Sequence, residues 1–318
     1  MKTEVLSRAL TLRAAPCFMR PMNALQPRAT APQAEPPFVL RRPAVPTPLV
    51  FASPHSGRRY PDDLLQASAL DDRAIRKSED AFVDELIDGA VEHGAAVIAC
   101  SVARAYVDVN REPWELDPAM FEDDLPPFAR AQTARVQAGL GSIAKVVAEG
   151  QEIYARKLTF AEAEARIGAV HAPYHKALAA LVAEAKARFG LAVLIDWHSM
   201  PSAAGRAESR RGRIKPDVVL GDRHGEACGR PLSDLVRREL EAAGYAVAMN
   251  SPYAGGWTTQ TYGRPKDGVH ALQIELDRGL YLDERRVEPG AGFAGLKADL
   301  ERLFARLAAA DWAALHRT

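Results

Sequence analysis

Short apolar runs alternate along the chain with longer segments in which apolar residues recur at helical spacing. The apolar runs are rich in strand formers and bounded by turn residues, so they predict strands. The predicted strands are 47–54, 95–102, 104–112, 191–198, 217–225, 245–253 and 269–278. The predicted helices begin at Ser78, cover most of 131–188 with a break at Gly168 or Pro173, and cover 226–243 and 291–310. Strands that alternate with helices predict an α/β fold, a three-layer sandwich around a mixed, mostly parallel sheet.

The remaining segments are polar or rich in proline and glycine, and we expect them to be loops. The main ones are 113–130, 201–216 and 255–265. Residues 1–45 differ from the rest of the chain, since they contain many Arg, Ala and Pro residues but few acids. We predict a disordered or loosely attached leader over 1–45 and a single domain over 46–318.

The charge balance excludes several classes of protein. Lys and Arg together number 41, as do Asp and Glu, so the formal net charge is zero and no overall field would attract nucleic acid or a membrane surface. No apolar run approaches the roughly 18–20 residues that cross a bilayer. The three cysteines form no paired motif, which is typical of a reducing compartment, so we expect a cytoplasmic protein. The sequence does not indicate an oligomeric state.

Two of the eight histidines, His55 and His198, lie at the ends of apolar strands. The carboxyl ends of strands are where α/β proteins bind ligands. Two histidines and one carboxylate, with an open fourth position, form a common catalytic zinc site, and Glu79 and Asp80 are both candidates for the carboxylate. His224 also ends a strand and is a reserve ligand. We expect the others, at 93, 171, 175, 270 and 316, to be structural or surface residues.

Two acidic residues on the predicted strands extend this candidate site. Asp196 shares a strand face with His198, so we expect it to orient the imidazole, with an ordinary turn residue as the alternative. Glu275 interrupts an otherwise apolar strand, where a carboxylate is costly to bury. Beside a metal, Glu275 would serve as the general base that takes a proton from water.

A neighbouring pair, Asn110 and Arg111, offers donors for a substrate carboxylate. An arginine fork pairs with a carboxylate through two hydrogen bonds, and an adjacent asparagine adds further donors. The alternative is that the pair forms only surface contacts with Asp108 or Glu112.

Six motifs of the chain combine these residues in a fixed order. They are PHSG at 54–57, SEDAFVDEL at 78–86, RAYVDVNR at 104–111, DWHSMPS at 196–202, NSPYAGGWTTQTYGRP at 250–265 and ALQIELDRGLY at 271–281. Together they resemble the N-formylglutamate amidohydrolase family over about 48–285. That family is similar in turn to zinc carboxypeptidases, so the resemblance implies a zinc-carboxypeptidase-like fold and one zinc ion, or another divalent metal.

The resemblance implies a role for each candidate residue. The implied metal ligands are His55, Asp80 and His198, the catalytic residues Glu275 and Arg104, the substrate-binding residues Asn110, Arg111, Thr259, Tyr262 and Arg278, and the orienting residue Asp196. Glu79 is the alternative to Asp80. The carboxypeptidase pattern has its glutamate ligand where this chain has Arg58, so the carboxylate must come from elsewhere.

The implied activity is metal-dependent hydrolysis of the amide bond of a small anionic N-acyl amino acid. The first candidate substrate is N-formyl-L-glutamate, giving L-glutamate and formate, which the family would place in histidine degradation. The alternatives are another N-acyl amino acid, a peptide, or binding of an anionic ligand without turnover. A glutamate side chain would need a second cation, which Arg278, Arg264 or the basic loop 206–213 could supply.

Overall fold

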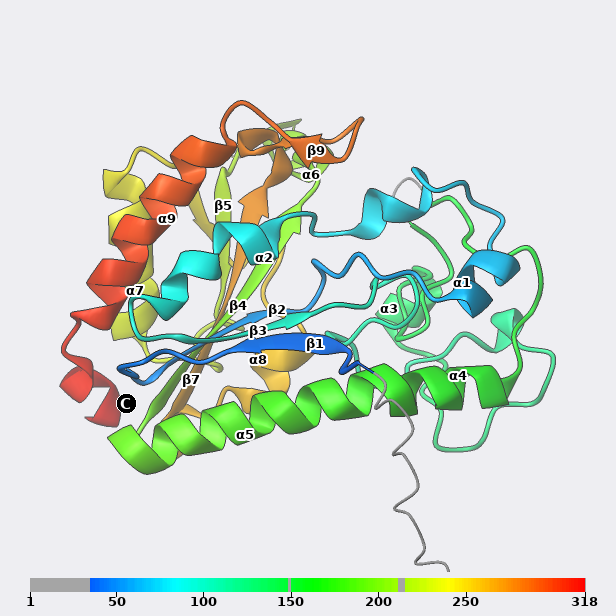
Figure 1. Cartoon of the computed structure of the whole chain (residues 1–318), viewed down its shortest axis with the longest axis horizontal. Helices are drawn as coiled ribbons and strands as arrows, with labels where there is room; N and C mark the ends of the chain where they lie inside the picture. Colours follow the sequence, from blue (N-terminus) through cyan, green and yellow to red (C-terminus); the bar gives the residue numbers. More distant parts are fainter. Residues whose placement is uncertain (1–34, 148–149, 211–214, 318) are drawn as a thin grey trace, which may run out of the picture. The chain divides into compact units, whose positions relative to one another are not determined.

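The computed structural model describes residues 35–147, 150–210 and 215–317, and within them seven strands form one mixed sheet (Figure 1). The strand order is β1-β3-β2-β4-β7-β5-β6. The strands are β1 (Phe38–Arg41), β2 (Leu49–Ser53), β3 (Ala96–Cys100), β4 (Ala192–Met200), β5 (Val218–Gly221), β6 (Val247–Met249) and β7 (Val269–Asp277). Only the pairs β1–β3 and β5–β7 are antiparallel within this sheet. The predicted α/β fold with a mixed, mostly parallel sheet is confirmed.

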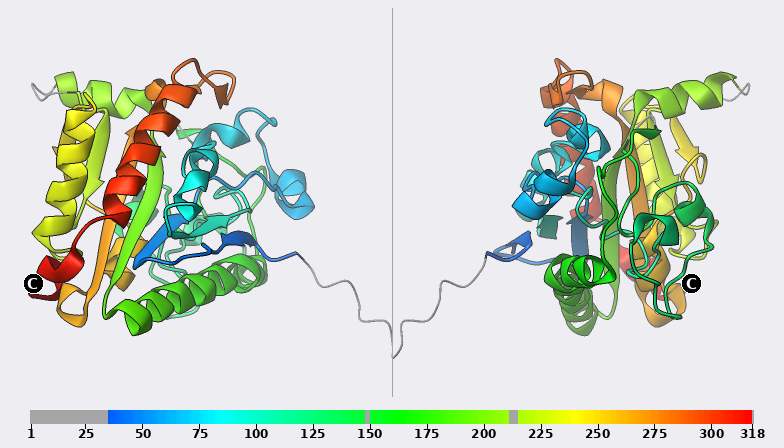
Figure 2. Two further views of the ribbon diagram at one scale, coloured as in Figure 1. Left: turned by 60° about the vertical axis from the view of Figure 1, so that its left-hand side comes forward. Right: turned by 90° about the vertical axis from the view of Figure 1, so that its right-hand side faces the viewer.

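Successive residues of the central strands pack on opposite faces of the sheet, as the pleat requires. In β4, Ile195 and Trp197 belong to one hydrophobic core, whereas Ala192 and Leu194 belong to a second. The first core includes residues of α2 (Val83–Leu86), α7 (Arg230–Ala242) and α9 (Phe293–Ala308), and the second includes residues of α4 (Phe160–Arg166) and α5 (Ala172–Phe189). Helices therefore cover both faces and give three layers (Figure 2).

The remaining elements are short. They are α1 (Asp62–Ala67), α3 (Ala134–Gln137), α6 (Ser202–Arg210), α8 (Trp257–Tyr262), a hairpin of β8 (Leu282–Asp283) and β9 (Glu288–Pro289), the 3₁₀ helices η1 (Ile75–Ser78), η2 (Asp88–Val91), η3 (Pro118–Met120), η6 (Pro265–Asp267), η7 (Arg278–Leu280) and η8 (Trp312–Arg317), and the π-helical turn η5 (Ile167–His171). Among the described residues, no helix combines the length and the apolar character that a membrane span requires.

The sheet brings distant segments of the chain to one edge. Strands β2, β4 and β7 are adjacent and parallel, so their carboxyl ends meet. His55 follows β2, while His198 lies near the end of β4 directly beside Glu275 of β7. The three residues are therefore placed together by strand register rather than by their spacing in the sequence.

Several local predictions are wrong. Residues 104–112 form turns rather than a strand, and their backbone bonds to other loops, as in the hydrogen bond from Asp108 N to Ser142 O (2.7 Å). The expected loops 201–216 and 255–265 contain the helices α6 and α8. Ser78 ends η1 instead of capping a helix, and α2 begins only at Val83.

The long helix expected over 131–188 is also wrong in its first half. Between residues 131 and 159, only α3 is α-helical among the described residues, and Gly139, with a φ of +74°, ends that helical turn. From Phe160 the chain is continuously helical to Phe189, without the expected break. Pro173 cannot donate an intrahelical hydrogen bond, and the wider π-helical turn that directly precedes α5 accommodates it.

The predicted leader overlaps the first strand of the sheet. Residues 1–34 lie outside the described part of the chain, so the prediction for them is not tested. Strand β1, however, pairs antiparallel with β3 from Phe38↔Cys100 to Arg41↔Val97. The expected boundary after residue 45 is therefore too late, because β1 belongs to the sheet.

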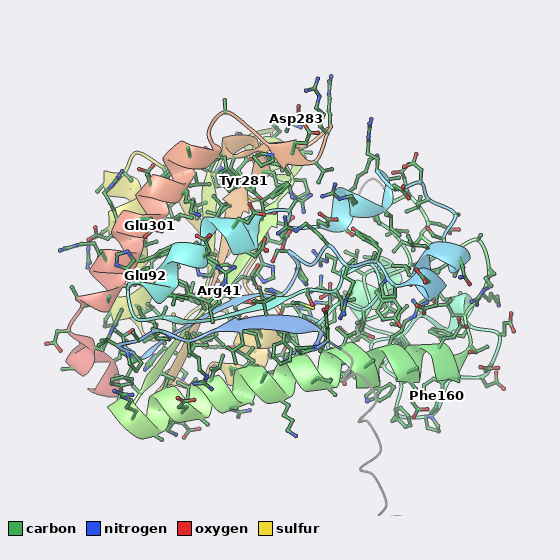
Figure 3. All side chains as sticks on the ribbon, in the orientation of Figure 1. Arg41, Glu92, Phe160, Tyr281, Asp283 and Glu301 are labelled. Carbon is green, nitrogen blue, oxygen red and sulfur yellow. The ribbon has the colours of Figure 1, made fainter. Side chains whose placement is uncertain are left out.

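An aromatic cluster packs helix α9 against the first core. The ring of Phe304 lies 5.2 Å from that of Phe51 and 5.7 Å from that of Trp197, measured between centroids. On the same helix lies Glu301 (Figure 3), which pairs with Nε2 of His93 at 2.9 Å and so links α9 to the segment after η2. His93 is thus a structural residue, as expected.

Replacing Phe304 tests this packing. Phe304 is fully buried, so Phe304→Ala should lower the free energy of unfolding by about 3–5 kcal/mol, while Phe304→Leu should cost much less. Urea unfolding followed by tryptophan fluorescence measures both. Equal stability of the alanine variant and the wild-type chain would contradict the proposed core.

Candidate metal centre and its pocket

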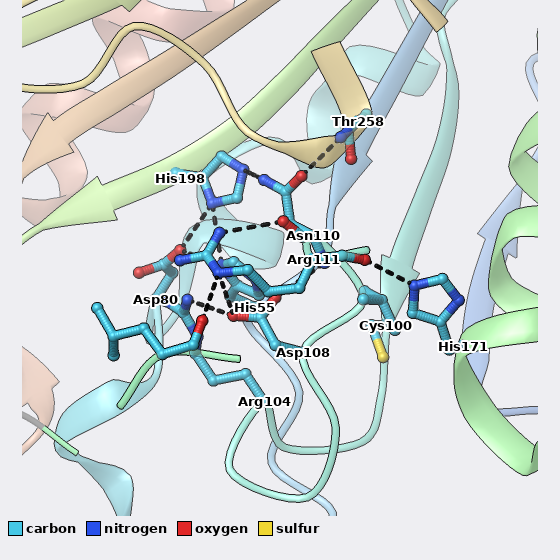
Figure 4. A network of polar contacts seen from close by, with 12 residues as sticks. His55, Asp80, Cys100, Arg104, Asp108, Asn110, Arg111, His171, His198 and Thr258 are labelled. Carbon is cyan, nitrogen blue, oxygen red and sulfur yellow. Dashed lines mark hydrogen bonds and ion pairs between the residues drawn. The ribbon is translucent and has the colours of Figure 1, made fainter. Parts of the chain in front are cut away.

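Three buried side chains converge at the carboxyl edge of the sheet: His55, Asp80 and His198 (Figure 4). Nδ1 of His55 lies 3.2 Å and Nδ1 of His198 lies 3.0 Å from Oδ2 of Asp80, and the two Nδ1 atoms are 3.1 Å apart. Each residue offers one ligand atom to a shared point, so the three could hold a metal ion. The structure thus brings together the two predicted histidines and one of the two candidate carboxylates.

A second layer of partners fixes the direction in which each imidazole points. Nε2 of His55 donates to Oδ1 of Asp108 (2.7 Å), and Nε2 of His198 lies 3.0 Å from Oδ2 of Asp196. With both Nε2 atoms protonated, both Nδ1 lone pairs point inward. The arrangement matches the orienting role expected of Asp196 and adds Asp108 as its counterpart for His55.

The inward atoms are all hydrogen-bond acceptors in this tautomer, so they need a positive charge between them. Burial alone would lower the pKa of His198, but the carboxylates of Asp196 and Asp80 raise it well above its ordinary value. Burial would likewise raise the pKa of Asp80, yet His198 and His55 hold it well below its usual range. Both pKa shifts have the same cause. A positive charge stabilises the cluster, and either a proton or a metal ion can supply it.

The choice between Glu79 and Asp80 depends on which way each side chain points. Oε1 of Glu79 accepts hydrogen bonds from Tyr60 Oη (2.5 Å) and from Arg76 Nε (2.9 Å), so this carboxylate lies outside the metal cluster. Arg58, which stands where the carboxypeptidase pattern has its glutamate, also points away and pairs with Asp84 (2.6 Å).

Arg278 orients Asp80. Its Nη2 donates to Oδ1 of Asp80 (3.0 Å), its Nε donates to Ser199 Oγ (3.0 Å), and its Nη1 donates to the carbonyl oxygen of Lys77 (3.0 Å). Ser199 Oγ donates to the same Asp80 oxygen (3.0 Å). The guanidinium group is therefore occupied by structural partners, which disagrees with the expected role of Arg278 in substrate binding.

Glu275 lies beside the metal cluster in a position suited to proton transfer. It is the register neighbour of His198, and its Oε1 accepts a hydrogen bond from Gln273 Nε2 (2.8 Å). Burial is the main cause that raises the pKa of Glu275 to about 7. A carboxylate with such a pKa exchanges protons readily near neutral pH.

A cavity of about 570 Å³ opens onto these groups. One wall is formed by the metal cluster and Glu275, a second by residues 252–256, and a third by Gly150 and parts of 135–147. Arg104 lines the cavity and donates from Nη2 to Oδ2 of Asp108 (2.6 Å). Tyr253, which sequence reasoning missed, lines it as well.

Asn110 and Arg111 both line the cavity but differ in their availability. Nδ2 of Asn110 donates to Oδ2 of Asp196 (3.1 Å), and its Oδ1 accepts from the backbone N of Thr258 (2.7 Å). A Cβ atom on Gly256 would lie only 2.4 Å from Asn110 Nδ2, so glycine is needed there. Asn110 therefore positions Asp196 and the start of α8, in place of the expected substrate clamp.

Arg111 keeps part of its guanidinium group open. Its Nε donates to Leu140 O (3.0 Å) and its Nη1 donates to Asn110 O (3.0 Å), while its Nη2 has no hydrogen-bond partner among the described residues. Arg111 thus remains a candidate for binding a substrate carboxylate.

Thr259 and Tyr262 do not line the cavity, so their expected contact with substrate is not supported. Thr259 is buried and donates from Oγ1 to Gly256 O (3.0 Å). The ring of Tyr262 stacks on that of His175, with centroids 5.9 Å apart. Both residues lie on α8, and their side chains pack against the protein interior instead of facing the cavity.

His171 and His175 hold the segment that carries Asn110. Nε2 of His171 lies 2.9 Å from Arg111 O, and Nε2 of His175 lies 2.6 Å from Val109 O. The two histidines are four residues apart and therefore lie on one face of a helix. This spacing is the feature of the sequence that could have indicated their shared role. His224, the reserve ligand, is exposed and lies outside the metal cluster.

Of the other arginines expected to supply a second cation for the substrate, Arg264 and Arg206 do not line the cavity. The side chains of Arg210, Arg211 and Arg213 lie outside the described residues.

Comparisons with known proteins agree with this site. A model of the N-formylglutamate amidohydrolase family matches residues 47–282. The N-formylglutamate deformylase of Pseudomonas aeruginosa is 32% identical over 242 residues, covering 75% of this chain and 83% of that protein. That of Pseudomonas putida is 29% identical over 240 residues, covering 74% and 82%.

Two solved structures share the fold. The crystal structure of N-formylglutamate amidohydrolase from Ralstonia eutropha JMP134 is 39% identical with a TM-score of 0.80, and the match covers 86% of this chain and 97% of that chain. Gene product Atu2144 from Agrobacterium tumefaciens has a TM-score of 0.61 at 17% identity, with coverage of 85% and 94%, and supports the fold alone.

Fold and site together define an α/β protein with a candidate metal centre at the carboxyl edge of parallel strands. The chain belongs to the N-formylglutamate amidohydrolase family. The resemblance seen in the six sequence motifs is therefore confirmed.

The environment of His175 predicts an unusual titration. Burial, and to a smaller extent the charge of His171, lower the pKa of His175 to about 4 from 6.5. Because the folded pKa lies below the unfolded value, the stability from neutral His175 is present above pH 6.5 and declines as the pH falls toward 4. The Hε1 resonance of His175, assigned with His175→Gln, should stay constant in NMR spectra from pH 5.5 to 8. A midpoint near 6.5 would contradict the burial of this ring.

Proposed function

We propose that the chain is a zinc-dependent deformylase that hydrolyses N-formyl-L-glutamate to L-glutamate and formate. The observation that carries the proposal is the set of three inward-facing acceptor atoms of His55, Asp80 and His198. They lie beside the carboxylate of Glu275, which lines the cavity. The names of the similar proteins support the choice of substrate. Histidine degradation, as the pathway, and the zinc-carboxypeptidase-like character of the fold belong to the same proposal.

The donor set fits zinc. Ligand atoms about 2.0–2.1 Å from a tetrahedral zinc ion lie roughly 3.3 Å from one another. The three separations here are 3.0, 3.1 and 3.2 Å, and two imidazoles with one carboxylate are ligands that zinc favours. When bound, zinc supplies activation of water and polarisation of a carbonyl group.

The residues of the chain account for the rest of the reaction. Glu275 takes a proton from the attacking water and delivers it to the departing amine nitrogen, and its pKa of about 7 suits both transfers. The Arg104 guanidinium, next to Asp108, stabilises the negative charge that develops on the formyl oxygen. Arg111 binds the α-carboxylate through its open Nη2. Burial of these groups strengthens each charge interaction.

Removing one imidazole tests the metal ligands. His198→Ala should lose bound zinc and release of formate from N-formyl-L-glutamate together, because the remaining pair leaves the site incomplete. Metal analysis and a formate assay measure the two properties. His224→Ala, which removes an exposed histidine outside the cluster, is the matched control and should keep both. Full activity of the His198 variant would refute the assignment.

Removing only the charge of Glu275 separates proton transfer from metal binding. Glu275→Gln should retain zinc but lower kcat by about 10²–10⁴-fold, since the amide cannot accept the proton. The comparison of metal content with kcat distinguishes this result from loss of the site. If the variant kept wild-type kcat, Glu275 would not be the base.

A further inference from the structure

The cavity contains more positive charge than its own acids neutralise. The side chains that line it include five cationic ones, Lys77, Arg104, Arg111, Arg135 and Arg278. The acids that line it are Asp80, Asp108 and Glu275, and Asp80 and Asp108 also hold the two histidines. With a metal ion added, the positive excess grows, so the cavity favours a ligand with more than one negative charge.

Three of the five cations already have partners at the site. Arg278 is bound to Asp80, Ser199 and the carbonyl of Lys77, and Arg104 pairs with Asp108. Lys77 Nζ donates to Gln151 Oε1 (3.0 Å). Arg104 also serves the formyl oxygen in the proposed function, so Arg111 and Arg135 are the two that remain for the carboxylates of a ligand.

Arg135 is held at a fixed place relative to Arg111. Thr133 caps α3 by accepting a hydrogen bond from Val136 N (3.2 Å), and Arg135 lies in that helix. Leu140 N donates to Arg135 O (2.8 Å), and Leu140 O accepts from Arg111 Nε (3.0 Å). Leu140 therefore links the backbone of Arg135 to the side chain of Arg111.

The guanidinium group of Arg135 is only loosely occupied. Its ion-pair partner is Glu115, with Nη1 3.7 Å from Oε2, longer than a hydrogen bond. Burial, and then the charges of Arg104 and Arg135, lower the pKa of Arg111, although Asp108 opposes this. The positive charge of Arg135 thus acts on Arg111, which lines the same cavity, and a dianion bound there would offset both charges.

We propose that Arg135 is a specificity-determining residue that binds the side-chain carboxylate of an N-acyl dicarboxylic amino acid. The assignment rests on the proposed function, in which Arg111 binds the α-carboxylate. An arginine fork recognises a carboxylate through two charge-assisted hydrogen bonds, which a neutral side-chain amide cannot reproduce. Arg135 was missed in the sequence because it lies in a helix of four residues inside a segment that resembles a long surface helix.

Two substrates of nearly equal shape test the assignment. N-formyl-L-glutamate and N-formyl-L-glutamine differ in side-chain charge, and formate release gives kcat/KM for each. The wild-type enzyme should prefer the glutamate substrate at least tenfold. Arg135→Ala should lower kcat/KM for that substrate by about 10–100-fold, mainly through KM, and change the value for N-formyl-L-glutamine by less than about threefold. Arg135→Lys should retain part of the preference.

Arg130→Ala is the control, because it removes an exposed arginine five positions earlier that does not line the cavity, and it should leave the preference unchanged. Equal losses of Arg135→Ala on both substrates, or an unchanged preference, would overturn the role of Arg135 alone. A wild-type enzyme that released formate from neither substrate would overturn the proposed function and this assignment with it. The activity of the variant on N-formyl-L-glutamine shows that it is folded.

Discussion

Three buried acceptor atoms that face one another are the constraint on which the site depends. Nδ1 of His55, Nδ1 of His198 and Oδ2 of Asp80 lie within 3.2 Å of each other, and without a cation between them their lone pairs would repel. Each atom is held in place from behind, by Asp108, by Asp196, and by Arg278 with Ser199. These contacts therefore fix the direction in which every ligand atom points.

The scaffold behind this cluster combines a rigid sheet with a loop that is held on two sides. Parallel strands fix His198 and Glu275 in register. The turn that carries Asp108 and Asn110 has no ladder of its own, so other elements must hold it. His171 and His175 contact its carbonyl oxygens from the helical layer, while α8 donates to Asn110 from the opposite side. Because π-helical turns are frequent at functional sites, the turn at Ile167–His171 fits this supporting role.

How much the sequence could predict depended on whether a signal was local. His55, His198, Asp196 and Glu275 were found because strand periodicity and strand ends are visible in the pattern of apolar residues. The pattern of apolar residues left both Glu79 and Asp80 open, and only the resemblance favoured Asp80. The difference between them depends on Tyr60 and Arg76, which bind Glu79.

Other contacts of the site residues could not be predicted because they join distant parts of the chain. Asn110 meets partners 86 and 148 residues away, and Arg278 uses its donors on Asp80, Ser199 and Lys77. The glycines in 255–265 predicted a loop, but the segment between them forms α8 and buries Thr259. No periodicity of residue types encodes these contacts. The sequence thus indicated which residues meet at the site more reliably than the positions of its supporting residues.

The central claim is that one metal ion bound by His55, Asp80 and His198 makes this chain a deformylase. The most direct test is to remove bound metal with a chelator and then titrate zinc into the protein while measuring formate release from N-formyl-L-glutamate. Activity should be absent without metal and should rise linearly to a plateau at one zinc ion per chain. Full formate release from the metal-free protein would contradict the account.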